Sequence, residues 1–301
     1  MIDAGLLKPR EKVSRYPAAL TSPDRRRLHF FVLFPLFLFF CFPLFAQLPK
    51  LQFQHVTVEQ GLSHPCINEI CEDSIGFMWF GAFSGLNRFD GKQIKSMATP
   101  SIHALCTAEN GDVWFGSAAG VTGLSCLSVA RDTIFRYELA SFGAGVRAIV
   151  NDPDSSLWIG TDIGLFHMNP KSGKFNRMGT EALADSGVNS MADDRHGNLW
   201  LVTRGKIVRF EKATQKGQFV CNRPGNWHSA TSVAPDGSIW VAGGTRGRLF
   251  RIDPKSLHLD SIFEGSPRYP TTRFVTIDAS GIVYVGTTDE GLKVYDPVVP
   301  T

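Results

Sequence analysis

Residues 151–170 read NDPDSSLWIGTDIGLFHMNP, and this stretch decides the fold. Asp152 and Pro153 favour a tight turn, because Pro fixes its own backbone and Asp hydrogen-bonds to nearby amides. The apolar run around Trp158 is typical of a short strand, and Gly164 permits a second reversal before another alternating stretch. Short strands joined by tight turns indicate antiparallel hairpins.

The same pattern recurs along the chain, which makes it a repeat. Each copy joins a turn rich in Asp and Gly to an aromatic residue and then to a second turn and an apolar strand. The aromatic markers lie 35 to 44 residues apart, a period typical of a β-propeller blade. The copies are 72–90, 108–121, 151–170, 193–210, 234–254 and 277–297, with markers Trp79, Trp114, Trp158, Trp200, Trp240 and Tyr284.

The third copy predicts a complete four-stranded blade, with strands at 146–151, 157–160, 165–169 and from 174 onward. One such sheet cannot bury its apolar faces alone, whereas a stack of them can. No marker Trp is followed by Asp, which excludes the WD40 signature, and no stretch after residue 50 shows a helical period. The predicted fold class is therefore all-β, a propeller of about six four-stranded blades.

The first 46 residues are set apart from the repeats. Three arginines precede the apolar stretch 28–46, as in an export signal. We expect a signal peptide over 1–46. An uncleaved signal anchor and a true start downstream of Met1 are the alternatives, since the apolar stretch is long enough to span a bilayer. The propeller domain is expected over 47–301, with repeats near 53–100, 101–143, 144–187, 188–226, 227–270 and 271–301.

The ends of the repeat region predict how the ring closes. The sixth repeat stops after its third strand, at 291–296, and the leading segment 53–58 has no blade of its own. We expect residues 53–58 to supply the missing outer strand, because an unpaired sheet edge invites aggregation. A native ring of seven blades would instead leave a gap here.

Charge and motifs argue against nucleic acid, metals and cofactors. Without the leader the chain holds 24 basic and 25 acidic residues, which leaves no basic footprint for nucleic acid. There is no HExxH, GxSxG or Walker A motif and no zinc-like Cys or His spacing, so we nominate no catalytic residue. Acidic turn residues recur at the repeat period, which favours turn capping over calcium binding or acid–base catalysis. They are Asp73, Asp152, Asp193, Asp194, Asp236 and Asp278.

One end of the propeller is the expected ligand side. The turn between the second and third strands of a blade lies on the same side as the blade-to-blade loops, and the Asp turns lie opposite. Trp227, the only Trp outside the marker positions, and His228 are the best candidates, because an exposed aromatic beside polar groups suits a sugar ring. Packing of Trp227 on a neighbouring blade is the alternative. The other residues expected near the central mouth are His64, Phe83, His103, Asp162, Arg204, Arg246, Arg268, Tyr269 and Asp289.

The pattern D-x-x-G-x-x-W-x-G-x-x-x-G-L-x-x-[FY]-[DN] resembles the two-component regulator propeller repeat. The first copy carries it most fully, with EQGLS at 59–63 and GLNRFDG at 85–91. Similar segments open the periplasmic sensor region of hybrid two-component histidine kinases. The resemblance covers about 53–297 and weakens in the second and fourth copies. It leaves open whether the chain is a fragment of a longer sensor or a free-standing propeller.

The resemblance implies an extracytoplasmic sensor, periplasmic or extracellular, that binds an oligosaccharide or another small molecule. It would pass the signal to a kinase module or a partner protein, and would reach a membrane only through an uncleaved leader or a further C-terminal part. An enzyme is one alternative, because the Asp-Gly-x-x-Trp spacing is also similar to the streptogramin lyase repeat. Its candidate groups are His228 and His103 with Asp162 or Asp289. A scaffold that binds another protein through its flat face is the other alternative.

Overall fold

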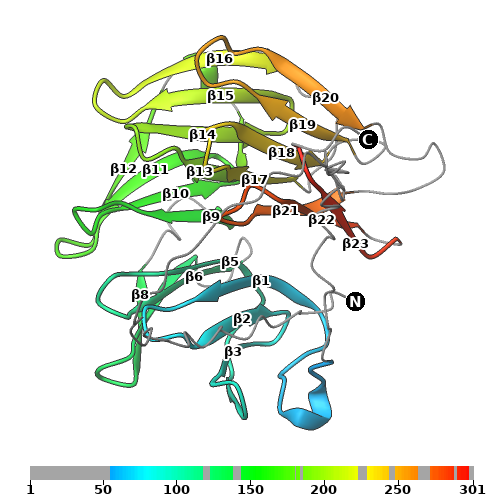
Figure 1. The fold of residues 1–301 in the computed structure, drawn as a ribbon. Helices are drawn as coiled ribbons and strands as arrows, with labels where there is room; N and C mark the ends of the chain where they lie inside the picture. Colours follow the sequence, from blue (N-terminus) through cyan, green and yellow to red (C-terminus); the bar gives the residue numbers. More distant parts are fainter. Residues whose placement is uncertain are drawn as a thin grey trace, which may run out of the picture. The chain divides into compact units, whose positions relative to one another are not determined.

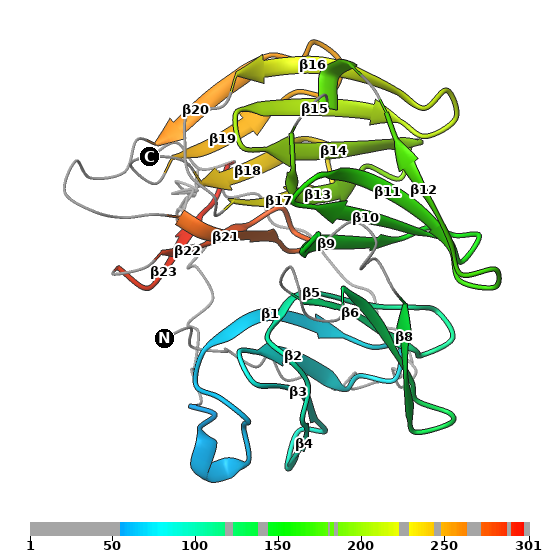
Figure 2. The same cartoon turned by 180° about the vertical axis from the view of Figure 1, so that it is seen from behind.

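The computed structural model describes residues 55–117, 123–137, 144–179, 181–183, 186–222, 229–243, 248–263, 272–287 and 290–297. These residues form six antiparallel sheets and two single 3-10 turns, η1 (Val58–Gln60) and η3 (Glu181–Leu183). The predicted six-bladed β-propeller is confirmed (Figure 1, Figure 2). Within these ranges, no helix has the length and apolar character needed to cross a bilayer.

The first three blades each have four strands that pair in chain order. Blade 1 consists of β1 (Ile67–Glu72), β2 (Met78–Ala82), β3 (Gly85–Phe89) and β4 (Ile94–Met97). Blade 2 consists of β5 (Ile102–Thr107), β6 (Val113–Ser117), β7 (Leu124–Ser128) and β8 (Thr133–Tyr137). Blade 3 consists of β9 (Val146–Asn151), β10 (Leu157–Thr161), β11 (Gly164–Asn169) and β12 (Lys174–Met178), which are the strands that its sequence predicts.

The remaining blades follow the same order. Blade 4 consists of β13 (Val188–Asp193), β14 (Asn198–Thr203), β15 (Lys206–Glu211) and β16 (Lys216–Asn222). Blade 5 consists of β17 (Ser229–Val233), β18 (Ile239–Gly243), β19 (Leu249–Ile252) and β20 (Leu259–Phe263). Blade 6 has three strands within the described residues, β21 (Thr272–Ile277), β22 (Val283–Thr287) and β23 (Leu292–Tyr295).

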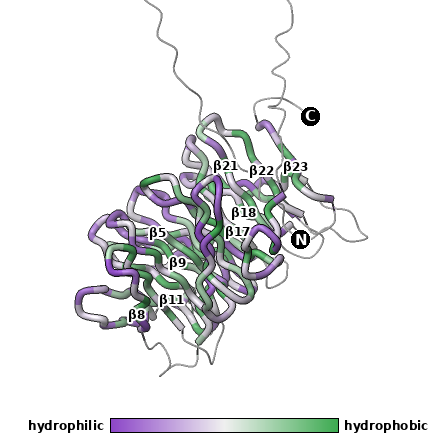
Figure 3. Tube along the Cα trace, turned by 90° about the horizontal axis from the view of Figure 1, so that it is seen from below, coloured by the Kyte–Doolittle hydropathy of each residue, from purple (hydrophilic) through white to green (hydrophobic). Residues whose placement is uncertain are grey.

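The marker tryptophans fill the spaces between blades. Trp114 of blade 2, for example, packs in one cluster with Val146 and Ile149 of blade 3. All five marker Trp side chains are buried, and Trp79, Trp200 and Trp240 are among the largest fully buried side chains. Figure 3 shows hydrophobic stretches along the strands and hydrophilic stretches in many of the turns. Each blade thus buries its apolar faces against its neighbours, as a repeat of this size must.

A glycine two residues after the marker lets consecutive blades approach closely. The first strands contact one another in the order β1, β5, β9, β13, β17 and β21. A Cβ added to Gly116 would lie 2.3 Å from Cγ1 of Val146, the first residue of the next blade. The same test gives 2.6 Å from Gly81 to Ile102 and 2.9 Å from Gly160 to Val188. These glycines are therefore required by packing rather than by backbone conformation.

The fourth blade has no glycine two residues after its marker. Val202 occupies the glycine position there and is fully buried. Ser229, the first described residue of the next strand, lies eleven residues before Trp240 and therefore corresponds to Asn189 in blade 4. The residue that corresponds to Val188 lies outside the described residues.

The expectation that residues 53–58 form a strand is wrong for the part that the structure describes. Residues 55–57 belong to no strand and Val58 begins η1. Thr57 and Gln60 form a capping box, in which the Thr57 amide donates to Oε1 of Gln60 at 2.9 Å. The chain then crosses blade 1, where the Ser63 amide donates to Oδ1 of the buried Asn87 at 2.9 Å. These local bonds hold the segment against blade 1.

The outer face of blade 6 is partly exposed to solvent. Phe274 is 47% exposed and Leu292 is 41% exposed, and the marker Tyr284 is only half-buried. A Cβ on Gly286, the glycine after this marker, would meet only Phe274 of its own sheet within 4 Å. The sequence prediction of a last sheet with three strands of its own is confirmed, and its outer face is partly open to solvent.

Candidate functional site

The two ends of the blades carry different residues. At one end lie the turns between the first and second strands, which hold the recurring aspartates. At the other end lie the turns between the second and third strands, together with the starts of the innermost strands. The Asp162 amide donates to the carbonyl of Gly145 at 3.0 Å, which places that second kind of turn beside the start of β9.

At the end that holds the recurring aspartates, the carboxylates stabilise the turns and the marker residues. Asp73 accepts hydrogen bonds from the amides of Ile75 and Phe77 at 3.1 and 3.0 Å and from the indole Nε1 of Trp79 at 2.8 Å. Asp152, Asp194 and Asp278 hold the marker of their own blade in the same way. Each carboxylate is thus occupied by its turn and its marker, as the capping interpretation predicts.

Asp193 and Asp236 do not belong to that set. In blade 5 the equivalent position is Ala234, and Nε1 of Trp240 donates instead to the hydroxyl of Ser238 at 3.0 Å. Asp236 accepts from the hydroxyl and the amide of Ser238. Asp193 has a separate role between two blades.

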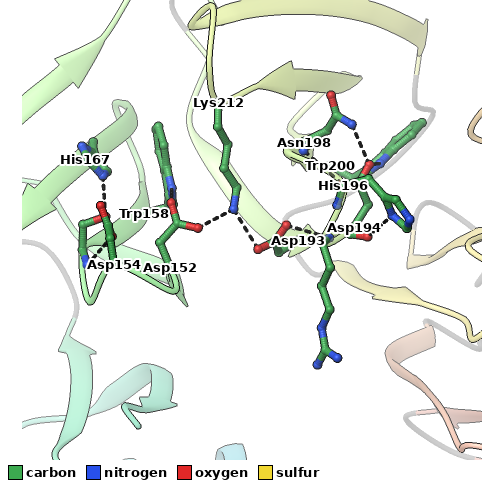
Figure 4. A network of polar contacts seen from close by, with 12 residues as sticks. Asp152, Asp154, Trp158, His167, Asp193, Asp194, His196, Asn198, Trp200 and Lys212 are labelled. Atoms are coloured by element: carbon green, nitrogen blue, oxygen red, sulfur yellow. Dashed lines mark hydrogen bonds and ion pairs between the residues drawn. The ribbon is translucent and has the colours of Figure 1, made fainter. Parts of the chain in front are cut away.

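Lys212 joins blades 3 and 4 at this end (Figure 4). Its Nζ lies 2.6 Å from Oδ1 of Asp152 and 2.8 Å from Oδ2 of Asp193. All three side chains are at least four-fifths buried. Burial lowers the pKa of Lys212, but the hydrogen bonds to both carboxylates outweigh it and the net shift is upward. The group is an inter-blade clamp.

The opposite end carries a repeated irregularity. In five of the six pairs of first and second strands, the register skips the second residue of the innermost strand, which is a β-bulge. Every bulged residue is polar and lies eleven residues before its aromatic marker. Bulges re-aim side chains at barrel rims and near functional sites. The bulged residues, called the bulge ring below, are Asn68, His103, Arg147, Asn189 and Arg273.

Two members of the bulge ring hydrogen-bond to groups beside the ring. Nδ2 of Asn68 donates to the carbonyl of Ile102 at 2.7 Å, beside His103. Nε of Arg147 donates to Oδ1 of Asp162 at 2.8 Å, and its Nη2 lies 3.4 Å from Oδ2. Burial lowers the pKa of His103, the nearby Arg147 lowers it further, and Asp162 opposes both. His103 is therefore mostly neutral at neutral pH.

An aromatic side chain stands beside the ring. Phe83, in the turn between β2 and β3, is 48% exposed. Its ring centroid lies 5.6 Å from that of His64 and 6.2 Å, edge-on, from that of His103. The exposed face of Phe83, flanked by two inclined imidazoles, can stack against a ring-shaped ligand.

Asn189 adds an unsatisfied donor. Its Nδ2 is buried and has no hydrogen-bond partner among the described residues. A buried donor without a partner is destabilising by about 1–3 kcal/mol, and such a group in a native structure calls for an explanation. An acceptor oxygen of a bound ligand would supply one.

The structure places five of the predicted site residues at this end. His64, Phe83, His103 and Asp162 are brought together as described, and Arg204 is exposed in the corresponding turn of blade 4. The remaining candidates lie outside the described residues: Trp227, His228, Arg246, Arg268, Tyr269 and Asp289. In the part of the chain that the structure covers, no three His, Cys, Asp or Glu side chains gather as a metal site would require.

Sequence reasoning missed Asn68, Arg147, Asn189 and Arg273. The signal was present, since a polar residue stands at one fixed distance before the marker, in the second position of an otherwise apolar strand. Taken together, the ring offers amide, imidazole and guanidinium donors next to an exposed aromatic face. Such a set can bind a ligand rich in oxygen acceptors.

Comparison with known proteins supports the fold. No family model and no curated protein sequence matches the chain. Among solved structures, the extracellular domain of the hybrid two-component system BT3049 from B. thetaiotaomicron is 19% identical, with a TM-score of 0.67 over 81% of this chain and 35% of that one. The extracellular domain of BT4673 from the same organism is 16% identical, with a TM-score of 0.52 over 78% and 38%.

A second kind of neighbour is an enzyme. A catalytically inactive virginiamycin B lyase from Staphylococcus aureus, solved with quinupristin, is 16% identical, with a TM-score of 0.67 over 81% of this chain and 84% of the lyase. This chain spans only about a third of the two extracellular domains. At these identities the comparisons support the fold alone: the chain has the overall fold of these structures, and its own six sheets make it a six-bladed propeller.

Proposed function

We propose that this chain is the ligand-binding propeller of an extracytoplasmic sensor in a two-component signalling system, and that its ligand is an oligosaccharide. The observation that carries the proposal is the bulge ring, in which five blades turn a polar side chain out of register at the same end. Blade 5 pairs in continuous register over its described residues. We assign the bulges to ligand binding, because bulges re-aim side chains near functional sites.

The chemistry of this end suits a sugar. Phe83 offers an exposed aromatic face, and Asn68, His103 and Asn189 offer polar groups that can bond to hydroxyls. A few polar groups around an aromatic surface are typical of small-molecule sites. The similarity to extracellular domains of two-component systems supports the sensor role and the location outside the cytoplasm.

A panel of oligosaccharides tests the proposal by thermal unfolding of the purified protein. A ligand that binds only the folded state raises the midpoint, by about 2.7 kcal/mol of stability at a hundredfold excess over Kd. We expect a rise with at least one sugar, and its loss in Phe83→Ala. Phe219→Ala is the matched control, because Phe219 is 49% exposed on the outer strand β16. No rise with any sugar would overturn the proposal.

A lyase of the streptogramin type is the second candidate. Its support is the similarity to virginiamycin B lyase and the proximity of His103 to Asp162. Against it, both oxygens of Asp162 already face Arg147, so this carboxylate is poorly placed to activate the imidazole. Incubation with quinupristin, followed by mass spectrometry, decides the matter: a product that His103→Ala abolishes would establish the lyase.

A further inference from the structure

We infer that the ligand of this site is an acidic sugar, held by an oxyanion group such as a carboxylate or a sulfate in the bulge ring. This inference rests on the proposed sensor function and names its ligand class. Four of the five ring members, two asparagines and two arginines, can donate hydrogen bonds through a side-chain amide or guanidinium. None of the five carries a carboxylate. A donor-rich ring is complementary to an acceptor-rich group.

Among the described residues, the ion pairs near the ring leave one arginine without a carboxylate partner. Arg147 and Asp162 neutralise each other, and Nη1 of Arg147 makes no hydrogen bond to the described residues. Glu290, in the last turn at this end, is paired with Lys293. Arg273 is exposed, and within the described part of the chain it has no ion pair or hydrogen bond. Arg273 is therefore a guanidinium that no carboxylate among the described residues compensates.

Asn189 gives the inference its second support. Its buried Nδ2 lacks an acceptor, and β13 places it on the blade after Arg147. Innermost strands of consecutive blades are in contact, so an anion bound near Arg147 lies within reach of the next blade. A carboxylate or sulfate oxygen would satisfy the amide with a charge-assisted hydrogen bond, which is stronger than one to a neutral hydroxyl.

The aromatic surface at Phe83 favours a sugar over a free inorganic anion. Phe83 lies next to His103, and the pKa of that imidazole stays low because it is buried and close to Arg147. The exposed face of Phe83, with the imidazole of His103 edge-on beside it, thus provides an uncharged aromatic surface next to the donor-rich ring. A sugar ring that carries an acidic group matches both surfaces at once, whereas a small inorganic anion would leave the aromatic face uncovered.

Titration calorimetry with a pair of matched sugars tests the inference. Tetragalacturonate and its full methyl ester have the same rings, and only the acid is charged; a sulfated chondroitin disaccharide and its unsulfated form separate sulfate from carboxylate recognition. We expect one acid to bind about tenfold or more tightly than its neutral counterpart. The affinity should fall as salt is raised from 50 to about 500 mM, because charge interactions are screened.

Two variants locate the site. Arg273→Gln removes the exposed charge, and Asn189→Asp keeps the side-chain size while placing a negative charge in the ring; each should weaken acid binding about tenfold or more. Arg136→Gln, on the outer strand β8, is the matched control and should bind as the parent does. Unchanged binding in both ring variants would overturn the inference.

The outcomes separate the inference from the proposed function. Tighter binding of neutral sugars, or equal binding of acid and ester, would overturn the acidic-ligand inference and leave the sugar sensor standing. No binding of any sugar, charged or neutral, would overturn both. Binding of inorganic sulfate as tight as that of the sulfated disaccharide would also overturn it, since the aromatic surface would then contribute nothing.

Discussion

Glu69 is a carboxylic acid whose environment strongly disfavours its charged form. It follows the bulged Asn68 on β1 and pairs across the sheet with Gly81, whose added Cβ would touch Ile102 of blade 2. The carboxyl thus points toward the next blade. Burial raises the pKa of Glu69 to about 8, so the folded protein holds a protonated carboxylic acid at neutral pH.

This shift predicts a pH-dependent stability. In the unfolded chain Glu loses its proton near pH 4.3, whereas the folded state keeps it to about pH 8. The unfolded state therefore binds fewer protons between these values, and the free energy of unfolding falls as pH rises through the window. Glu69→Gln should match the parent near pH 4 and exceed it by about 2–4 kcal/mol at pH 8.

Urea unfolding across this pH range measures the effect. Glu72→Gln, an exposed neighbour on the same strand, is the control and should change little. A difference between Glu69→Gln and the parent that stays constant with pH would contradict the prediction.

At the scale of elements, adjacent blades are joined by tight contacts and by one charged clamp. Gly116→Ala would drive a methyl group into Val146, whose branched side chain has little rotamer freedom. We expect a loss of about 1–3 kcal/mol in unfolding free energy. Gly179→Ala is the control, since nothing lies within 4 Å of an added Cβ there. A double variant with Val146→Ala should show favourable coupling between the two changes.

The clamp gives a second prediction at this scale. Lys212→Met leaves the carboxylates of Asp152 and Asp193 facing each other in a largely buried place, and breaking such a buried pair costs about 3–5 kcal/mol. Lys95→Met is the control, because the Lys95–Asp132 pair spans 3.6 Å and is more than half exposed; pairs of that kind contribute about 0–1 kcal/mol. Equal losses in chemical unfolding would argue against the clamp.

The elements also show what sequence could and could not predict. Strand positions followed from turn residues and the marker, because those are local signals. The segment 53–58 was wrongly predicted as a strand. Thr57, Gln60 and Gly61 form a capped turn there, and these local interactions are stronger than the preference of the alternating pattern for a strand. The bulges could not be predicted from the polar residue before each marker alone, because Ser229 holds the same position in blade 5 and pairs in continuous register.

At the scale of the whole molecule, the sixth blade has an exposed sheet edge. In the described residues β23 is the last strand of its sheet, and Phe274 and Leu292 are exposed. An exposed apolar edge favours association between chains. Leu292→Lys should therefore reduce concentration-dependent self-association in light scattering without lowering the melting temperature. Phe135→Lys, at an exposed position on β8, should leave association unchanged if the edge is responsible.

The candidate site, too, could be predicted only in part from the sequence. His103, Phe83 and Asp162 could be placed at one end from turn order alone, because topology fixes the direction of each strand. The pairing of Asp162 with Arg147 and the unsatisfied amide of Asn189 depend on distances between blades. Those distances follow from side-chain packing, which no local sequence pattern encodes.

The contact between a glycine and the branched residue of the next blade also limits how this molecule could be rebuilt from its parts. A duplicate of blade 3 inserted after itself would place Val146 against Gly160, much as Val188 lies there now. The same duplicate inserted after blade 4 would meet Val202 instead, and the two branched side chains would collide. A blade that begins with Val146 thus fits behind a glycine but not behind Val202, so side-chain volume restricts the order in which blades can be joined.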